Sequence, residues 1–393
     1  YPVRDVALDV TLADRVLTVR KLAGEQGGGS FSAVGTVDFD GLANVDITGT
    51  DIALGIFTRF AGVEEDVTGT ASLSLHIGGY TQDPEADLKI TARNGGARGA
   101  SFDELTGEAQ LRSSIIRLNH LTVTKYIDGI AYSASAHGTL PLRALTAERG
   151  ENLSAYEEID LTVALDNADL SLLPIFAKQV EWAFGRAEGS LNLHGTLAAP
   201  RLTGGLRVTG GAMKLSYFEN PVTDMQLSLD ALGDSISVRA CTGKMGAGTY
   251  KLTGRSEISG TGLKSYDFTF VMEALEPKTS FFDGPISGSL RLTEGEYWGE
   301  TLPKLSGGIN IDRALVSIPT IPETDDDLPH IILDVGLTVD RHVHFFSANF
   351  YDIHPSGYVH FGGTTRHPHT TGMIGARRGD TVSYLRTVFK IRE

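Results

Sequence analysis

The stretch Gly189-Ser-Leu-Asn-Leu-His-Gly195, together with the residues that follow it as far as Arg255, decides the fold class. Apolar and polar residues alternate along it, as in Met225-Gln-Leu-Ser-Leu229. Such alternation is typical of β-strands with one dry face and one wet face. The turns between the alternating runs are rich in Gly, Asp, Asn and Pro, which favour tight reversals of the chain. The stretch therefore predicts an antiparallel β-meander.

The same pattern recurs on both sides of this stretch. Gly69-Thr-Ala-Ser-Leu-Ser-Leu-His76 precedes it, and Gly288-Ser-Leu-Arg-Leu292 follows it. The period is roughly 100 to 120 residues, so each repeat contains several strands. If one strand and its turn take roughly 14 residues, the chain forms about 28 strands. We expect one continuous body in three segments: β-groove repeat 1 at residues 1–150, repeats 2 and 3 at 151–320, and a C-terminal β segment at 321–393.

Composition limits the possible functions. The 393 residues include 46 glycines, which indicates many tight turns, and the formal net charge of −15 argues against a nucleic-acid partner. The single cysteine, Cys241, forms no internal disulfide and is expected to be a small, half-buried residue. No apolar run is long enough to span a membrane. Both ends of the chain lie within the strand pattern, and Leu385–Glu393 is predicted to be a strand, so we expect a fragment of a longer protein.

Three segments interrupt the alternation and are predicted to contain short helices. These are residues 51–62, residues 169–185, where Phe176, Val180 and Phe184 have helical spacing, and, more weakly, residues 277–282. Two roles are expected for such helices: they cover the open face of a sheet, or they pack in an ordinary hydrophobic core.

The sequence contains no recognisable catalytic or metal site. The glycine-rich segment Gly24–Gly29 lacks the Lys-Ser/Thr of a phosphate-binding loop and is followed by a strand, so it is predicted to be a hairpin turn. Seven histidines follow residue 329, but their spacing does not bring ligands together, and His342 and His344 are expected to face water. The acidic segment Pro319–Pro329 is predicted to be an exposed loop. We predict that the protein is not an enzyme and has no metal and no cofactor.

A long sheet with one apolar face needs something to cover that face. A second sheet, a closing barrel or an apolar ligand would each do so, and the predicted helices are too few. We therefore predict an all-β fold: an elongated, twisted antiparallel sheet curled into an open hydrophobic groove, a β-taco, with a few short helices. The predicted groove residues are Leu8, Val10, Met225, Leu227, Leu229, Ile236, Val238, Leu252, Phe268, Phe270, Leu290, Ile309, Leu333, Val335 and Leu337.

The chain resembles the TamB family of AsmA-like proteins, over nearly its whole length. The resemblance rests on the Pro-x-Leu-x-Gly-Gly strands, on Asp51-Ile-Ala-Leu54 and Asp169-Leu-Ser-Leu172, on Leu333-Asp-Val-Gly-Leu-Thr-Val339, and on the stretch from Gly357 to Ile391. It implies a periplasmic protein of a diderm bacterium, anchored in the inner membrane by a helix that this sequence lacks. It also implies a groove that conducts phospholipids toward the outer membrane, and docking to an Omp85-family barrel of the TamA or BamA type.

The C-terminal segment is the predicted docking end, because an edge strand has unpaired N–H and C=O groups that invite strand addition by a partner. Its predicted docking residues are Val382, Tyr384, Arg386, Val388 and Lys390. The alternative is that this segment pairs with a further strand of the same protein. For the chain as a whole, the alternative function is a closed β-sandwich or β-solenoid that acts as an adhesin or structural scaffold without lipid.

Overall fold

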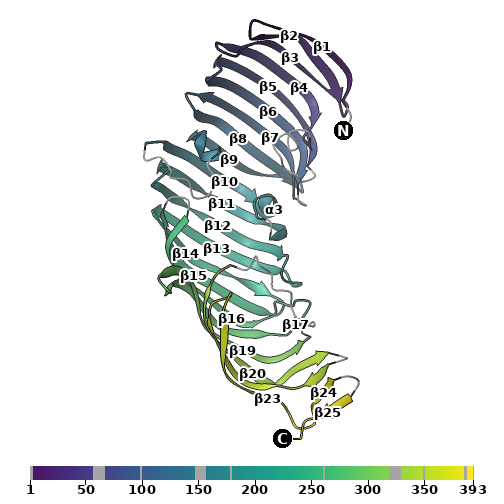
Figure 1. The fold of residues 1–393 in the computed structure, drawn as a ribbon, viewed down its shortest axis with the longest axis vertical. Helices are drawn as coiled ribbons and strands as arrows, with labels where there is room; N and C mark the ends of the chain where they lie inside the picture. The colour runs from purple at the N-terminus through teal and green to yellow at the C-terminus, as the bar shows by residue number, and fades with distance from the viewer. Residues whose placement is uncertain are drawn as a thin grey trace. The chain divides into compact units, whose positions relative to one another are not determined.

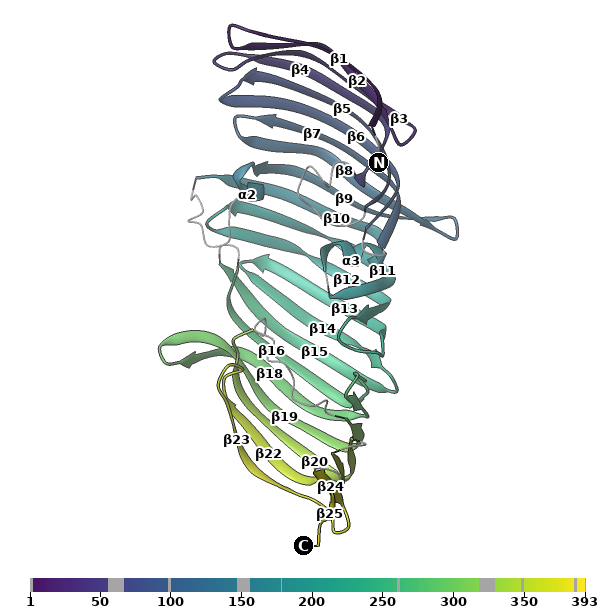
Figure 2. The ribbon, with the colours of Figure 1, turned by 45° about the vertical axis from the view of Figure 1, so that its right-hand side comes forward.

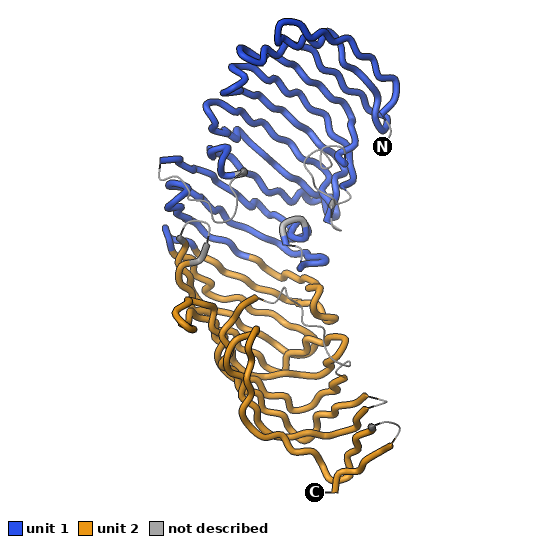
Figure 3. Tube along the Cα trace, viewed as in Figure 1, with its two compact units in different colours: residues 1–207, 231–234, 259–262 blue, residues 208–230, 235–258, 263–393 orange. Residues whose placement is uncertain are grey.

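The computed structural model describes residues 3–55, 67–97, 100–146, 156–177, 179–259, 262–317, 329–347, 350–384 and 387–392. Over these residues the fold is all-β, with 25 strands and a few short helical turns (Figures 1 and 2). Most neighbouring strands are antiparallel, and the sheet is not closed into a barrel. The predicted fold class is confirmed. The chain divides into two compact units, residues 1–207, 231–234 and 259–262 in unit 1 and the remainder in unit 2 (Figure 3).

Unit 1 is a meander in which each strand pairs with the next along the sequence. Ten antiparallel pairings hold the eleven strands in register. The strands are β1 (Val3–Ala13), β2 (Val16–Gln26), β3 (Gly29–Asp38), β4 (Ala43–Ala53), β5 (Thr68–Tyr80), β6 (Asp83–Ala97), β7 (Ala100–Arg112), β8 (Ile115–Ile127), β9 (Ile130–Pro141), β10 (Glu158–Asp169) and β11 (Val180–Thr196). A helical turn, α2 (Arg143–Thr146), follows β9.

Unit 2 begins within β12 (Pro200–Leu215) and ends with two short branches of sheet. β20 pairs with β22 along one half and with β21 along the other; β22 continues to β23, and β21 continues to β24 and β25. The strands are β13 (Val222–Gly233), β14 (Ser235–Met245), β15 (Gly248–Ser259), β16 (Gly262–Leu275), β17 (Phe282–Asp283), β18 (Ile286–Tyr297), β19 (Glu300–Val316), β20 (Ile332–Ser347), β21 (Tyr351–Ile353), β22 (Ser356–Gly363), β23 (Pro368–Gly375), β24 (Thr381–Tyr384) and β25 (Thr387–Lys390).

One strand pair departs from the predicted meander. β19 and β20 are parallel, from Lys304 opposite Ile332 to Val316 opposite Phe345. A parallel pair needs a connection long enough to return the chain to the starting end of the first strand. Residues 317–331 provide that length, and the predicted acidic loop within them, from Pro319 to Leu328, lies outside the described residues. Alternation of apolar and polar residues is the same in parallel and antiparallel strands, so the sequence analysis predicted an antiparallel pair here.

The predicted helices are mostly wrong. Residues 169–185 contain only a 3₁₀ turn, η1 (Leu170–Leu172), and one turn of helix, α3 (Leu173–Phe176), while Val180 and Phe184 belong to strand β11. The carboxylate of Asp169 caps this element by accepting hydrogen bonds from the backbone N–H of Ser171 at 2.8 Å and of Gly185 at 3.1 Å. Residues 277–282 form no helix, and residues 56–62 of the first predicted helix lie outside the described residues.

The predicted strand Leu385–Glu393 is also shorter than expected. β24 and β25 form a hairpin in which Val382 is opposite Phe389, and β25 covers only Thr387–Lys390. The predicted strand is thus confirmed over Thr387–Lys390 but not over residues 391 and 392, and residues 385, 386 and 393 lie outside the described residues.

The strands of unit 1 are bent by β-bulges, which the sequence analysis did not anticipate. The registers shift next to Asp5, Asp51, Asn94 and Asn167, and each of these residues has a positive φ between 48° and 54°. Asp and Asn tolerate this left-handed conformation better than other residues with a Cβ atom. A bulge bends its strand and increases the local twist. These four residues therefore contribute to the curvature of the sheet within unit 1.

Replacing Asn94 tests this role. Asn94 is exposed and has φ 48°. We expect Asn94→Val to lower the free energy of unfolding of unit 1 by roughly 1–2 kcal/mol, because a β-branched residue is strained at positive φ. Asn94→Gly should change this free energy by only a few tenths of a kcal/mol, because glycine adopts positive φ without strain. Urea unfolding midpoints of the two variants measure the difference. Equal midpoints would contradict a bulge at this position.

Candidate functional site: an apolar sheet face

One face of unit 1 is apolar in every strand. Cross-strand pairing places one residue from each strand in a row that crosses the whole unit: Leu8, Leu22, Ala33, Ile47, Leu75, Leu88, Ala109, Leu118, Gly138, Leu161 and Leu193. A neighbouring row from β4 to β11 consists of Gly49, Leu73, Ile90, Gly107, Leu121, Ala136, Val163 and Leu191. We call the surface formed by these two rows the apolar face of unit 1. Within the rows no polar side chain interrupts it.

The large side chains of this face are only partly buried. Its leucines and isoleucines keep part of their surface exposed, and at the first strand Leu8 is 63% exposed. The fully buried positions of β5 and β6 are instead alanines, Ala71 and Ala92, at 1% each. A second protein layer would reduce the exposed fraction of these leucines to a few per cent, as in the core of a β-sandwich. Over the described residues, the apolar face therefore lacks such a layer.

Among the described residues, the helical turns η1 and α3 cover one end of this face. η1 and α3 contact β11 and also β7, so they cross several strands of unit 1. Ala183 and Ala187, which share the face of Leu191 by alternation, are buried in this part of β11. Pro174 of α3 is fully buried as well. The helical turn packs against the end of the apolar face and leaves the central rows uncovered.

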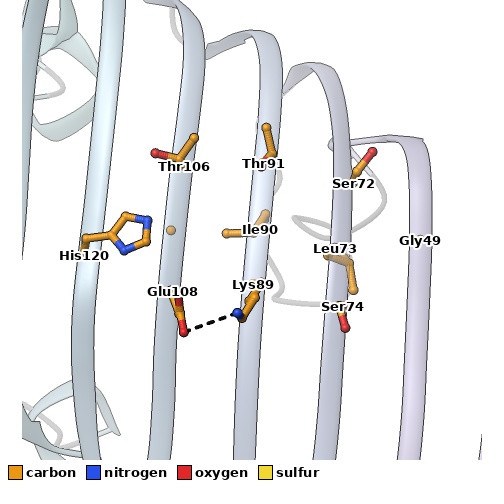
Figure 4. A pocket seen from close by; sticks show the side chains of 11 residues that line it. Gly49, Ser72, Leu73, Ser74, Lys89, Ile90, Thr91, Thr106, Glu108 and His120 are labelled. Atoms are coloured by element: carbon orange, nitrogen blue, oxygen red, sulfur yellow. Dashed lines mark ion pairs between the residues drawn. The ribbon is translucent and has the colours of Figure 1, made fainter.

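The opposite face of unit 1 is polar. A hollow of about 440 Å³ over β4 to β8 is lined by polar residues such as Ser72, Thr91, Thr106 and His120 and also by Gly49, Leu73, Ile90 and Gly107 of the second apolar row (Figure 4). The Lys89 ammonium lies 3.6 Å from the Glu108 carboxylate there. In the part of the chain that the structure describes, no serine in this hollow is hydrogen-bonded to His120. The described side chains of the hollow therefore do not form the nucleophile and base pair that acyl transfer needs.

Cross-strand ion pairs fix the charges of the polar face. The Arg112 guanidinium donates to Asp87 at 2.7 Å and lowers the pKa of that carboxyl. In unit 2 the pKa of Asp334 is lowered, mainly by the Lys304 ammonium, which lies 2.8 Å from its carboxylate, and also by the His360 ring, which lies 2.9 Å from it. Both carboxylates are therefore ionised at neutral pH. Pairing of this kind favours the orientation in which this face meets water.

Unit 2 also has an apolar face, built by its own register. One row consists of Phe270, Leu290, Gly307, Val335 and Phe361, and a second of Phe268, Leu292, Leu305 and Leu333. A third row contains Ile309 beside Leu337. On β13, Asp224 and Asp230 pair with Lys244 and Arg239 on the polar side, and alternation places Met225, Leu227 and Leu229 on the other side. On β14 and β15, Ile236, Val238 and Leu252 lie on one face, with Leu252 opposite Cys241.

The predicted groove residues differ in exposure. Leu8 and Val10 are exposed, whereas Met225 is 5% and Val335 9% exposed. The others are half-buried: Leu227, Leu229, Ile236, Val238, Leu252, Phe268, Phe270, Leu290, Ile309, Leu333 and Leu337. Ile309 and Leu337 pack against a closed core of Ile311, Ala314, Val316, Val339 and Val343, and Val343 is completely buried. The structure thus places these two residues beside a protein core rather than on an open surface.

Cys241 has no catalytic environment. Burial raises the pKa of its thiol, and burial is also the main reason that the pKa of the neighbouring Tyr250 hydroxyl is raised. Both groups are therefore protonated at neutral pH. A protonated, half-buried thiol is a poor nucleophile and serves as a packing residue.

The predicted docking residues lie on the terminal hairpin. Val382 is on β24, which pairs with β21 and β25, and Tyr384 ends the same strand. Val388 and Lys390 are on β25, whose side chains are exposed, and Arg386 lies outside the described residues. β25 has β24 as its strand partner, and its other edge is unpaired within the described residues. The outer edge of β25 is therefore available for pairing.

A cluster of histidine and aspartate side chains, which the sequence analysis missed, lies near this hairpin. His344 Nε2 is 2.8 Å from Asp352 Oδ1, and the rings of His344 and His354 are stacked with centroids 4.5 Å apart. The buried carboxylate of Asp380 accepts hydrogen bonds from the backbone and ring of His354. The sequence does carry a signal for this cluster. The segments His344-x-Phe346 and Asp352-x-His354 are only a few residues apart, so pairing of the two segments as a hairpin places these side chains on one face.

No family model matches the chain, and neither the curated proteins nor the solved structures provide a match. Among the helices of the described residues, none combines the length and the apolar character needed to cross a membrane.

Proposed function

We propose that this protein is a periplasmic bridge-like lipid transporter: it carries phospholipids between the inner and outer membranes of a diderm cell envelope, and performs no chemical step. Its apolar face takes up acyl chains. The observation that supports the proposal most strongly is the apolar row that crosses all strands of unit 1 while its leucines remain partly exposed. An acyl chain offers the cover that the described residues of unit 1 do not supply.

The energetics suit movement along the face as well as binding. Each methylene group of an acyl chain that leaves water gains roughly 0.8 kcal/mol. Successive strands of unit 1 present similar aliphatic side chains, such as Ile47, Leu75 and Leu88. Neighbouring positions therefore offer similar free energies, and a chain shifts between them at little net cost. Lipid head groups remain in water at the rim of the sheet.

Two other functions have less support. An adhesin or structural scaffold with a closed sandwich would bury its leucines as completely as Val343 in unit 2, and the rows of unit 1 are not buried in this way. An enzyme would need converging reactive groups, and the polar hollow beside His120 lacks them.

A matched pair of charge substitutions tests the transport path. Leu75 lies on the apolar face between Ile47 and Leu88, whereas its neighbour Ser74 lies on the polar face opposite Lys89. We expect Leu75→Asp to slow phospholipid transfer between vesicles by about tenfold or more, since a barrier of about 1.4 kcal/mol suffices and a charge against hydrocarbon costs more. Ser74→Asp should leave the rate unchanged. Fluorescent phospholipid transfer between donor and acceptor vesicles measures both rates.

The two variants place the same charge at neighbouring positions on opposite faces of the sheet. Their circular dichroism spectra and unfolding midpoints show whether both variants fold normally. If Leu75→Asp folded normally and transferred lipid as fast as Ser74→Asp, acyl chains would not travel over this face.

We further propose that the β24–β25 hairpin docks onto an Omp85-family barrel protein of the TamA or BamA type, and that an anchor outside this sequence attaches the protein to the inner membrane. Support for the docking comes from the outer edge of β25 and from the exposed side chains of Val388 and Phe389, at 64% and 56%. An edge strand of this kind pairs with a partner strand through its backbone.

Site-specific crosslinking tests the docking. A photoreactive residue in place of Val388 should crosslink to the barrel protein in cells, because β25 lies at the proposed interface. The same residue in place of Val10, on the exposed edge strand β1, serves as the control. Crosslinks from Val10 without crosslinks from Val388 would show that the opposite end of the chain docks.

A further inference from the structure

The long strand β20 and the short strand β21 of unit 2 bring three potential metal ligands together. His344 lies near the end of β20, and Asp352 lies on β21 with His354 just beyond it. The register pairs Phe346 with Asp352 and Phe345 with Ile353. Because alternate residues of a strand share a face, His344, Asp352 and His354 all project from one face. Their donor atoms lie within 4.8 Å of one another.

The opposite side of the same strand holds this arrangement in place. Val343, next to His344, is completely buried, and Phe345 packs against the same core. A ligand on a strand that is fixed in a core has little freedom to move away. The ligand side remains accessible, since the side chains of His344 and His354 are each 35% exposed. An ion can therefore enter from solvent.

Asp380 orients one of the ligands. Its side chain is only 6% exposed, and it accepts hydrogen bonds from the backbone N–H of His354 and Arg377 at 2.8 and 2.7 Å. Both of these backbone donors point at Oδ2, and Oδ1 lies 3.1 Å from His354 Nδ1, which donates its hydrogen to it. This leaves the lone pair of His354 on Nε2, as in metal sites where a carboxylate fixes the histidine.

The donor types favour one class of metal. Two imidazoles and one carboxylate suit zinc and similar transition ions, whereas calcium and magnesium prefer oxygen ligands alone. His344 Nε2 is hydrogen-bonded to Asp352 Oδ1, and the His344 ring is stacked on the ring of His354. For zinc to bind, the His344 ring turns out of this stack and Nε2 exchanges its hydrogen bond for the ion, while the neutral ring carries its hydrogen on Nδ1. Water completes the coordination.

We propose that His344, Asp352 and His354 form a binding site for one zinc ion, with Asp380 as a positioning residue behind His354. Asp380 also lies at the start of the terminal hairpin, where the Ile391 N–H donates to its backbone carbonyl at 2.8 Å. Zinc bound to the three ligands joins β20 to β21 directly and stabilises the hairpin through Asp380.

Zinc titration of the full chain tests the site. The purified protein, without an affinity tag and stripped of metal with a chelator, is titrated with Zn²⁺ against a chromophoric competitor at neutral pH. We expect one high-affinity ion per chain and a higher unfolding temperature with zinc. Co²⁺ should give visible absorption bands of low-coordinate cobalt, and Ca²⁺ should have no effect on either readout.

Matched variants assign the ligands. Asp352→Asn retains the size and one oxygen of the side chain, so the protein should fold but bind zinc at least tenfold more weakly, while Asp352→Glu should retain binding. His354→Ala should lose the site, and Asp380→Asn should weaken binding about 10- to 100-fold without changing the stoichiometry. His342→Ala is the control, because that side chain is 78% exposed on the same strand.

Two results would overturn the proposal. The first is the absence of high-affinity zinc binding to the folded wild-type chain. The second is zinc binding that is unchanged in Asp352→Asn and His354→Ala, which would assign the ion to other histidines. Neither result depends on lipid transport.

Discussion

The structure depends on one constraint: a single layer of sheet divides its side chains between an apolar and a polar face. The period of two residues along each strand and the cross-strand register together extend this division from strand to strand. In unit 1 the row from Leu8 to Leu193 is apolar at each strand, and the polar face carries paired charges such as Arg112 and Asp87. A register slip of one residue would place leucines among ion pairs. The hydrophobic effect and the ion pairs therefore favour the same register.

Apolar side chains that remain partly exposed reduce stability unless something else covers them. Unit 2 covers part of its face with protein, because β17 brings Phe282 against the core around Val343. Among the described residues of unit 1, the short turn at Leu170–Phe176 is the only such cover. The contrast between a core that is closed and a face that is partly exposed is the physical basis of the proposed lipid function. The same core gives the histidine cluster its rigid support.

Much of the fold follows from local pattern. Alternation in segments such as Met225–Leu229 predicted strands and their faces, and the glycine-rich segment Gly24–Gly29 predicted the hairpin between β2 and β3. Three features depend on longer-range information. The parallel pairing of β19 and β20 depends on the path of residues 317–331, and the bulges at Asp51 and Asn94 depend on backbone conformation. The predicted helical spacing at Val180 and Phe184 was wrong because both residues belong to strand β11, and tertiary context outweighs such a local periodicity. His344 and His354 meet only because β20 and β21 pair, and linear spacing did not indicate this.

The central claim is that the apolar face binds acyl chains, and native mass spectrometry of the purified chain tests it most directly. The protein is isolated under non-denaturing conditions from cells with phospholipid membranes. The account predicts species heavier than the bare 42.1 kDa chain by whole phospholipid molecules, which organic extraction then identifies. A folded chain that carries no phospholipid, and that takes up none when mixed with phospholipid vesicles, would contradict it.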